Sequence, residues 1–329
     1  MVSVLGWFAS QPTAFETTLV STLVSALVAV LTALMTLLVA PVLKYRFDLR
    51  LATQKTNLHY RVEQQRALRD SLLHYQGMFV EVAATLSARL WNFYAVENRD
   101  WLALHGNYRV VASDRGYFVR SFAYRILAVA AVARLVERDS IFIDRAVVRR
   151  TDFELLVALR LALRIWTDVD LFRDLPYDPK YARDHFFIDD LRAMADSFRS
   201  NRHGEVLLSF DAFQGAIAAA DHRYVEVLRY LDGLGRGEHR YRFDRLVCSH
   251  LLLLAVLNGY GYDYQRTSLR ALEDVARKCE HEQVLANLSD LIRQVKLDRN
   301  PSFREIVIVA ERVVRQRRMV VEPPAAAAL

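Results

Sequence analysis

Residues 17–43 (TTLVSTLVSALVAVLTALMTLLVAPVL) form an unbroken run of apolar and small polar residues with no charged side chain. At 1.5 Å per residue, a helix of this length measures roughly 40 Å, which is more than the hydrocarbon thickness of about 30 Å. A buried helix of a soluble protein rarely needs so long an uncharged run. The pattern therefore predicts a single transmembrane helix at 17–43, preceded by a short extracytoplasmic segment at 1–16.

Small residues recur along one side of this predicted span, at spacings of three and four. Small side chains let two helices approach closely in lipid, so the stripe predicts self-association of the span. Alternatively, the stripe arises by chance, because alanine, serine and threonine are common in spans. Its members are Thr18, Thr22, Ser25, Ala29, Ala33 (or Thr32 on the same turn), Thr36 and Ala40.

The chain after the span reads as a continuing helix, because residues 44–98 contain no proline and a single glycine, Gly77. The pattern predicts one long helix, or two joined near Gly77, with a stalk at 44–76 and a helical domain at 77–320. A stalk that is polar on most sides needs a partner, and we expect a second copy. The seam of the stalk contains apolar Phe47, Leu51, Leu58 and Val62, with Gln54 and Gln65 weakening the pairing.

Helical spacing continues through the rest of the chain and predicts an all-α fold. Asn300-Pro301 supplies a helix cap followed by proline at the first helical position. Two short runs, at 141–143 and 205–209, are candidate isolated strands, too few for a sheet. Residues 321–329 have no core-forming pattern and are predicted to be a flexible tail. The expected helices after the stalk are 117–138, 151–167, 184–200, 210–220, 223–231, 240–257, 268–295 and 301–318.

Charge predicts the orientation of the span. The segment before it carries Glu16 and no basic residue, whereas residues 44–70 carry seven Lys and Arg against three Asp and Glu. Positive charge beside a span stays in the cytoplasm, so we expect a bacterial-type inner-membrane protein with its N-terminus outside and its domain cytoplasmic. The basic residues nearest the span are expected to meet lipid headgroups. They are Lys44, Arg46, Arg50 and Lys55.

Composition narrows the function classes. Hydrophobic residues make up 53% of the chain, enough for a folded core, and the net charge of +6 is concentrated beside the span. The remaining chain is close to neutral, which argues against nucleic acid as a partner. Cys248 and Cys279 are too few for a disulfide framework or a zinc cluster, and we expect both to be reduced packing residues. The glycines at 233–237 lack the Lys-Ser/Thr of a phosphate-binding loop, and no cofactor is predicted.

The richest polar segment, 166–192, is the first candidate for a catalytic or metal site, because clustered carboxylates can hold a divalent cation. Its spacing fits no EF-hand, since both the turn glycine and the closing glutamate are missing. The structural alternative is a proline-bent connection whose acids cap helices and pair with arginines. The candidate catalytic residues are Asp168, Asp170, Asp174, Asp178, Asp184 and His185.

All-α ribonucleases of the HEPN class use an Arg-x(4–6)-His pair on a helix, so arginine–histidine pairs at this spacing are further catalytic candidates. Three pairs fit this spacing: Arg69 with His74, Arg99 with His105, and Arg245 with His250. A chain so rich in arginine produces about as many matches by chance, so the spacing carries little weight.

The sequence thus favours a membrane-anchored helical interaction or effector protein. It would act by self-assembly or partner binding at the cytoplasmic face, with the bilayer, a second copy and a further protein as partners. The alternative is a membrane-tethered hydrolase, metal-dependent or HEPN-like, that uses the 168–190 segment or an Arg/His pair. A non-enzymatic role is favoured, because no specific catalytic signature is present.

Overall fold

The computed structural model of the chain describes residues 13–96, 101–108, 114–139, 150–180, 184–199, 207–219 and 222–321. Within these ranges eleven α-helices and no strand occur, and the one bridge is an isolated antiparallel pair between Arg199 and Leu207. The predicted all-α fold is therefore confirmed. The candidate strand at 141–143 lies outside the described residues. The chain divides into two compact units, residues 1–66 and 67–329.

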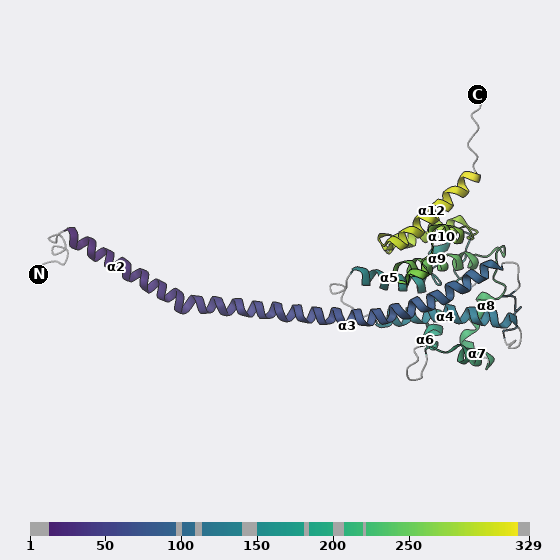
Figure 1. Ribbon diagram of the computed structural model, residues 1–329, viewed down its shortest axis with the longest axis horizontal. Helices are drawn as coiled ribbons and strands as arrows, with labels where there is room; N and C mark the ends of the chain where they lie inside the picture. The colour runs from purple at the N-terminus through teal and green to yellow at the C-terminus, as the bar shows by residue number, and fades with distance from the viewer. Residues whose placement is uncertain are drawn as a thin grey trace, which may run out of the picture. The chain divides into compact units, whose positions relative to one another are not determined.

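The first unit is built on one continuous helical path (Figure 1). Helix α2 (Thr13–Leu34) leads through a π-helical turn, η1 (Met35–Val39), into α3 (Ala40–Ala95). The π-turn ends two residues before Pro41, whose ring in a regular α-helix would clash with the carbonyl four residues back and which has no N–H to donate. Widening of the turn accommodates the proline, so the helix continues instead of ending there.

The stretch Thr17–Arg66 is long and apolar enough to cross a membrane, with a mean hydropathy of 2.6 in its most apolar window. None of that window is buried by the rest of the described chain. Its threonine hydroxyls bond within the helix: Thr22 to the Thr18 carbonyl (2.6 Å) and Thr36 to the Thr32 carbonyl (2.8 Å). These two hydroxyls are therefore satisfied without water, as a hydrocarbon environment requires.

Two central helices organise the core of the second unit. Helix α4 (Asp114–Asp139) packs against α5 (Arg150–Arg164), α6 (Ile188–Ser197), α7 (Phe210–Ala218) and α8 (Val225–Leu231). Helix α9 (Arg242–Tyr260) is buried on all sides from Arg242 to Leu257. The end of α3 joins both, because Phe93 contacts Phe122 of α4 and Phe243 of α9, with ring centroids 5.8 and 6.4 Å apart.

Three further helices cover α9: α10 (Leu269–Ala276), α11 (Glu282–Gln294) and α12 (Pro301–Val321) (Figure 1). The single helix expected at 268–295 is wrong, since the chain leaves the helix after Ala276 and re-enters it at Glu282. The carboxylate of Asp244 accepts the N–H groups of Glu280 (2.6 Å) and His281 (3.1 Å), which holds the break open.

Other predicted boundaries differ less from the structure. Helix α12 begins at Pro301 as expected, and Asn300 Oδ1 accepts the Ser302 N–H at 3.1 Å. Gly77 does not interrupt α3. Helix α6 begins at Ile188 instead of 184, so Asp184 and His185 belong to the connection that precedes it.

Candidate functional site

The acidic connection between α5 and α6 is held from α9 and α11. Arg245 of α9 is completely buried and donates to the backbone carbonyls of Asp184 (2.7 Å), Asp168 (2.9 Å) and Ile165. Asn287 of α11 donates to two further carbonyls of the connection. Because backbone groups are the partners, these contacts determine the course of the connection and leave its carboxylates for other roles.

The two buried aspartates of the connection have structural partners. Asp168 accepts the Asp170 N–H (2.9 Å) at the start of a short 3-10 turn, and its other oxygen lies 2.6 Å from Arg164 Nε. Asp184 accepts from Arg240 Nε at 2.9 Å. Each carboxylate thus faces an arginine of a neighbouring element.

The three remaining aspartates of the candidate set, Asp170, Asp174 and Asp178, are exposed. Asp174 has a positive φ of 66° and Asp178 accepts the Lys180 N–H, both typical of tight turns. In the part of the chain that the structure describes, no three His, Cys, Asp or Glu side chains converge to hold a metal ion. A catalytic role of these residues stays a prediction from the sequence.

His185 lines a hollow of about 330 Å³, together with Asp190 and Arg240. Its Nδ1 is hydrogen-bonded with the Tyr177 hydroxyl. Burial and then the positive charge of Arg245 lower the pKa of His185, while burial raises the pKa of Tyr177 to about 12. His185 is therefore a neutral, largely buried ring at neutral pH.

Metal binding by the exposed aspartates can be tested directly. We expect Asp170→Ala combined with Asp174→Asn to leave the thermal response to Mg²⁺, Mn²⁺ and Ca²⁺ unchanged, because these carboxylates do not converge. Asparagine is chosen at 174 because it tolerates positive φ. Melting temperatures of the purified chain, with and without each cation, are the measurement. A rise specific to one metal that disappears in the double variant would support the hydrolase alternative.

The arginine–histidine pair on α9 does not have the exposure that a catalytic pair requires. Arg245 and His250 are both completely buried. Burial lowers the pKa of His250 to about 3, and its Nε2 lies 3.0 Å from Ser87 Oγ. Arg69 and His74 are exposed on α3, and Arg99 lies outside the described residues.

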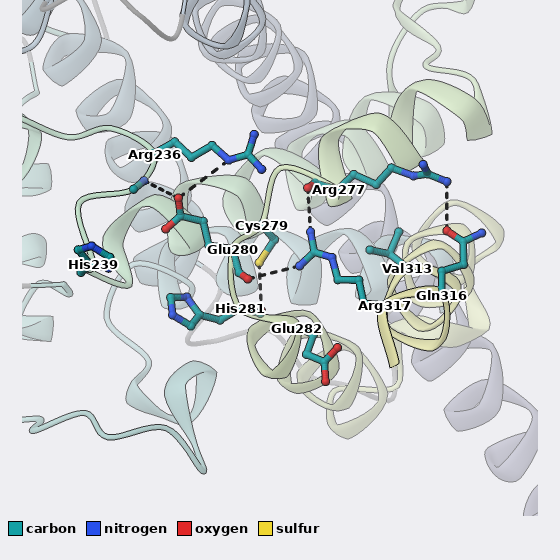
Figure 2. A pocket seen from close by; sticks show the side chains of 11 residues that line it. Arg236, His239, Arg277, Cys279, Glu280, His281, Glu282, Val313, Gln316 and Arg317 are labelled. Carbon is teal, nitrogen blue, oxygen red and sulfur yellow. Dashed lines mark hydrogen bonds and ion pairs between the residues drawn. The ribbon is translucent and has the colours of Figure 1, made fainter. Parts of the chain in front are cut away.

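A cavity of about 970 Å³ opens where the chain breaks between α10 and α11 (Figure 2). A glycine turn before α9, the 277–281 break with the first residue of α11, and one face of α12 form its walls. None of the catalytic candidates from the sequence belongs to it. The lining residues with polar side chains are Arg236, His239, Arg277, Cys279, Glu280, His281, Glu282, Gln316 and Arg317.

A buried carboxylate orients one histidine of this pocket. Asp244, 1% exposed, has its Oδ2 at 2.6 Å from Nδ1 of His281, whose side chain is 35% exposed. The ring of Tyr241 packs edge-to-face against the imidazole, with an angle of 66° between the ring planes and centroids 4.8 Å apart. With Nδ1 engaged by Asp244, Nε2 is the ring nitrogen that remains for a further partner.

Arginines supply the positive charge of the pocket. Arg317 of α12 donates to the carbonyls of Arg277 (2.8 Å) and Glu280 (3.4 Å), at the open end of α10. Arg236 lies 4.0 Å from the Glu280 carboxylate, and Arg277 pairs with Glu273 at 2.5 Å. Within the described chain, Arg317 therefore makes its contacts with backbone oxygens and with no carboxylate.

Cys279 lines the pocket but is not an activated nucleophile. It is completely buried, and burial together with a hydrogen bond to Cys248 raises the pKa of its thiol. A raised pKa keeps the thiol protonated, and the thiolate is the reactive form.

The sequence did not predict a site at Asp244 and His281, because the spacing predicted a continuous helix across the break. One signal was present: Cys279 is the sole apolar residue between Ala276 and Val284, and the next apolar position follows it five residues later, so the three–four spacing fails there. Nothing in the local pattern points to Asp244, which lies in the preceding helix.

No protein-family model matches the chain, and no curated protein or solved structure matches it.

Proposed function

We propose that this chain is a membrane-anchored helical interaction protein that crosses the membrane once and self-assembles through its N-terminal helix. One observation carries the proposal: along Thr17–Arg66 the most apolar window is entirely unburied by the rest of the described chain. A large apolar side chain left in water forgoes about 1.5–3 kcal/mol of burial free energy. A helix with this many exposed apolar residues needs lipid or another protein around it.

We expect lipid to cover the exposed apolar side chains in the first half of this helix. The uncharged run ends at Lys44, and Arg46, Arg50 and Lys55 follow within three turns, in position to meet anionic headgroups. The charge asymmetry favours a cytoplasmic second unit, as in a bacterial inner-membrane protein with its N-terminus outside.

We expect a second copy of the chain to cover the exposed apolar side chains of the stalk. Phe47, Leu51 and Leu58 are 70%, 42% and 64% exposed, and they lie beyond the run that lipid would cover. Their spacings of four and seven put them on one face of α3, the pattern of a helix–helix seam. Two copies of the same helix present the same face to each other, and Gln54 within the seam makes the contact modest in strength.

The topology can be tested by labelling with a membrane-impermeant maleimide in intact cells. We expect Ser3→Cys to react from outside and Thr56→Cys to react only after the membrane is opened. Cys248 and Cys279 are buried, so the unmodified chain serves as the background control. Labelling of both positions from the same side would refute the single crossing.

Assembly is tested by the mass of the detergent-solubilised particle, corrected for bound detergent. The proposal expects a discrete oligomer, and a strict monomer would contradict it. The rival function, a membrane-tethered hydrolase, is separated by the metal titration of the acidic connection described above.

A further inference from the structure

The pocket of Figure 2 has the size and construction of a small-molecule site. Its volume of about 970 Å³ falls at the upper end of the usual range for ligand pockets, roughly 300–1,000 Å³. Its walls come from segments far apart in the sequence, and the break at 277–281 is held in place by Asp244. The site is thus formed before any ligand arrives, which limits the entropy lost on binding.

The acidic side chains of the pocket are already engaged. Glu280 accepts the Gly237 N–H at 2.5 Å and lies near Arg236, while Glu282 pairs with Arg318 outside the pocket at 3.3 Å. The two carboxylates therefore face Arg236 and Arg318, whereas Arg317 contacts backbone carbonyls among the residues that the structure describes.

Arg317 retains hydrogen-bonding capacity toward the cavity. Its guanidinium has five N–H donors, and two of them reach the carbonyls of Arg277 and Glu280. These carbonyls fix the position of the side chain without neutralising its charge. A positioned guanidinium of this kind suits a ligand oxyanion, with which it forms strong charge-assisted hydrogen bonds.

His281 presents a second polar atom to the same cavity. Its Nδ1 is held by Asp244, so Nε2 is the ring nitrogen left to meet a ligand. A phosphate group has three oxygens and carries a proton on one of them in its monoanionic form, so one oxygen can accept from the guanidinium while the protonated one donates to Nε2. A carboxylate has fewer oxygens to divide between two separate partners.

From this arrangement we infer that the pocket binds a small molecule through its phosphate group, with Arg317 and His281 as the contacts. The remaining volume accommodates the organic part of the ligand. The phosphate belongs either to a soluble phosphoester or to a lipid headgroup, which share this chemistry. The inference concerns the second unit alone and does not depend on assembly through the stalk.

The test uses the full chain in nanodiscs of phosphatidylcholine, titrated with inorganic phosphate by calorimetry at constant ionic strength. In a second arm, phosphatidic acid replaces part of the phosphatidylcholine and the shift in melting temperature is measured. We expect binding in at least one arm, weakened about tenfold or more by Arg317→Met, as loss of a charge-assisted hydrogen bond implies. His281→Gln should weaken it several-fold.

The matched control is Arg315→Met, which removes the same charge from an exposed position of α12 outside this pocket. Binding that survives Arg315→Met and is lost in Arg317→Met supports the inference, and the responding arm identifies the source of the phosphate. Equal losses in the two arginine variants, or no binding in either arm, overturn it. If Arg317→Met melts far below the native protein, His281→Gln decides, and native affinity in that variant also overturns the inference.

Discussion

Replacing Leu51 and Leu58 by glutamate is expected to convert the detergent-solubilised oligomer into a monomer. Each leucine contributes about 1.5–3 kcal/mol when a partner helix buries it. Glutamates on the seam would also repel those of the second copy. Loss of two such contributions weakens association by roughly a hundredfold or more. Light scattering with detergent correction measures the particle mass across a range of protein concentrations.

The matched control replaces Thr53 and Thr56, which lie on the opposite side of the same helix and bond only to its own carbonyls. This pair introduces the same charge without touching the seam, so its particle mass should equal that of the native chain. If both pairs dissociate the oligomer equally, added charge and not the seam is responsible. An oligomer that survives the leucine substitutions would assign the contact to the span and contradict assembly through the stalk.

The second large effect is expected from Arg245→Met, which should lower the free energy of unfolding by about 3–5 kcal/mol. The substitution removes the donors for the carbonyls of Ile165, Asp168 and Asp184, and an unsatisfied buried polar group costs about 1–3 kcal/mol. Methionine keeps much of the side-chain volume, so the effect reports lost hydrogen bonds more than a cavity. Urea unfolding followed by circular dichroism measures it.

Arg173→Met is the matched control for this prediction. Arg173 pairs with Asp290 at 2.7 Å, but both side chains are nearly half exposed, and such surface pairs contribute about 0–1 kcal/mol. The two variants lose the same charge within one region of the fold. A loss at Arg245 no larger than that at Arg173 would show that the buried arginine does not hold the acidic connection.

The apolar helix and the all-α class could be predicted because both depend on neighbours along the chain. An uncharged run indicates a helix that can lie in lipid, and a three–four spacing indicates a helix with one apolar face. Both patterns depend only on the segment itself. The same holds for the start of α12, where Asn300 and Pro301 act within a single turn. The partner of the stalk could not be predicted in this way, because the spacing of residues within one helix does not identify the surface that the helix contacts.

The burial of individual aspartates in the acidic connection could not be predicted from the sequence. Its aspartates look alike in the sequence, yet Asp168 and Asp184 are buried whereas Asp170 and Asp174 are exposed. The difference is produced by Arg245, which lies on α9 and reaches the connection only once the helices have packed. Composition could identify this segment as polar but could not assign its side chains to a cation, a cap or solvent.

The sequence by itself determined the long apolar helix, the basic residues that follow it and the helical nature of everything after. Only the tertiary structure decided that the helical stretch after Ser268 breaks at 277–281 and opens a pocket. The physical reason is an acceptor from another helix: Asp244 captures the N–H groups of Glu280 and His281, which a continuous helix would have bonded to its own carbonyls. Helical periodicity depends on the apolar spacing within one segment. It therefore cannot predict a contact with a carboxylate that lies in another helix.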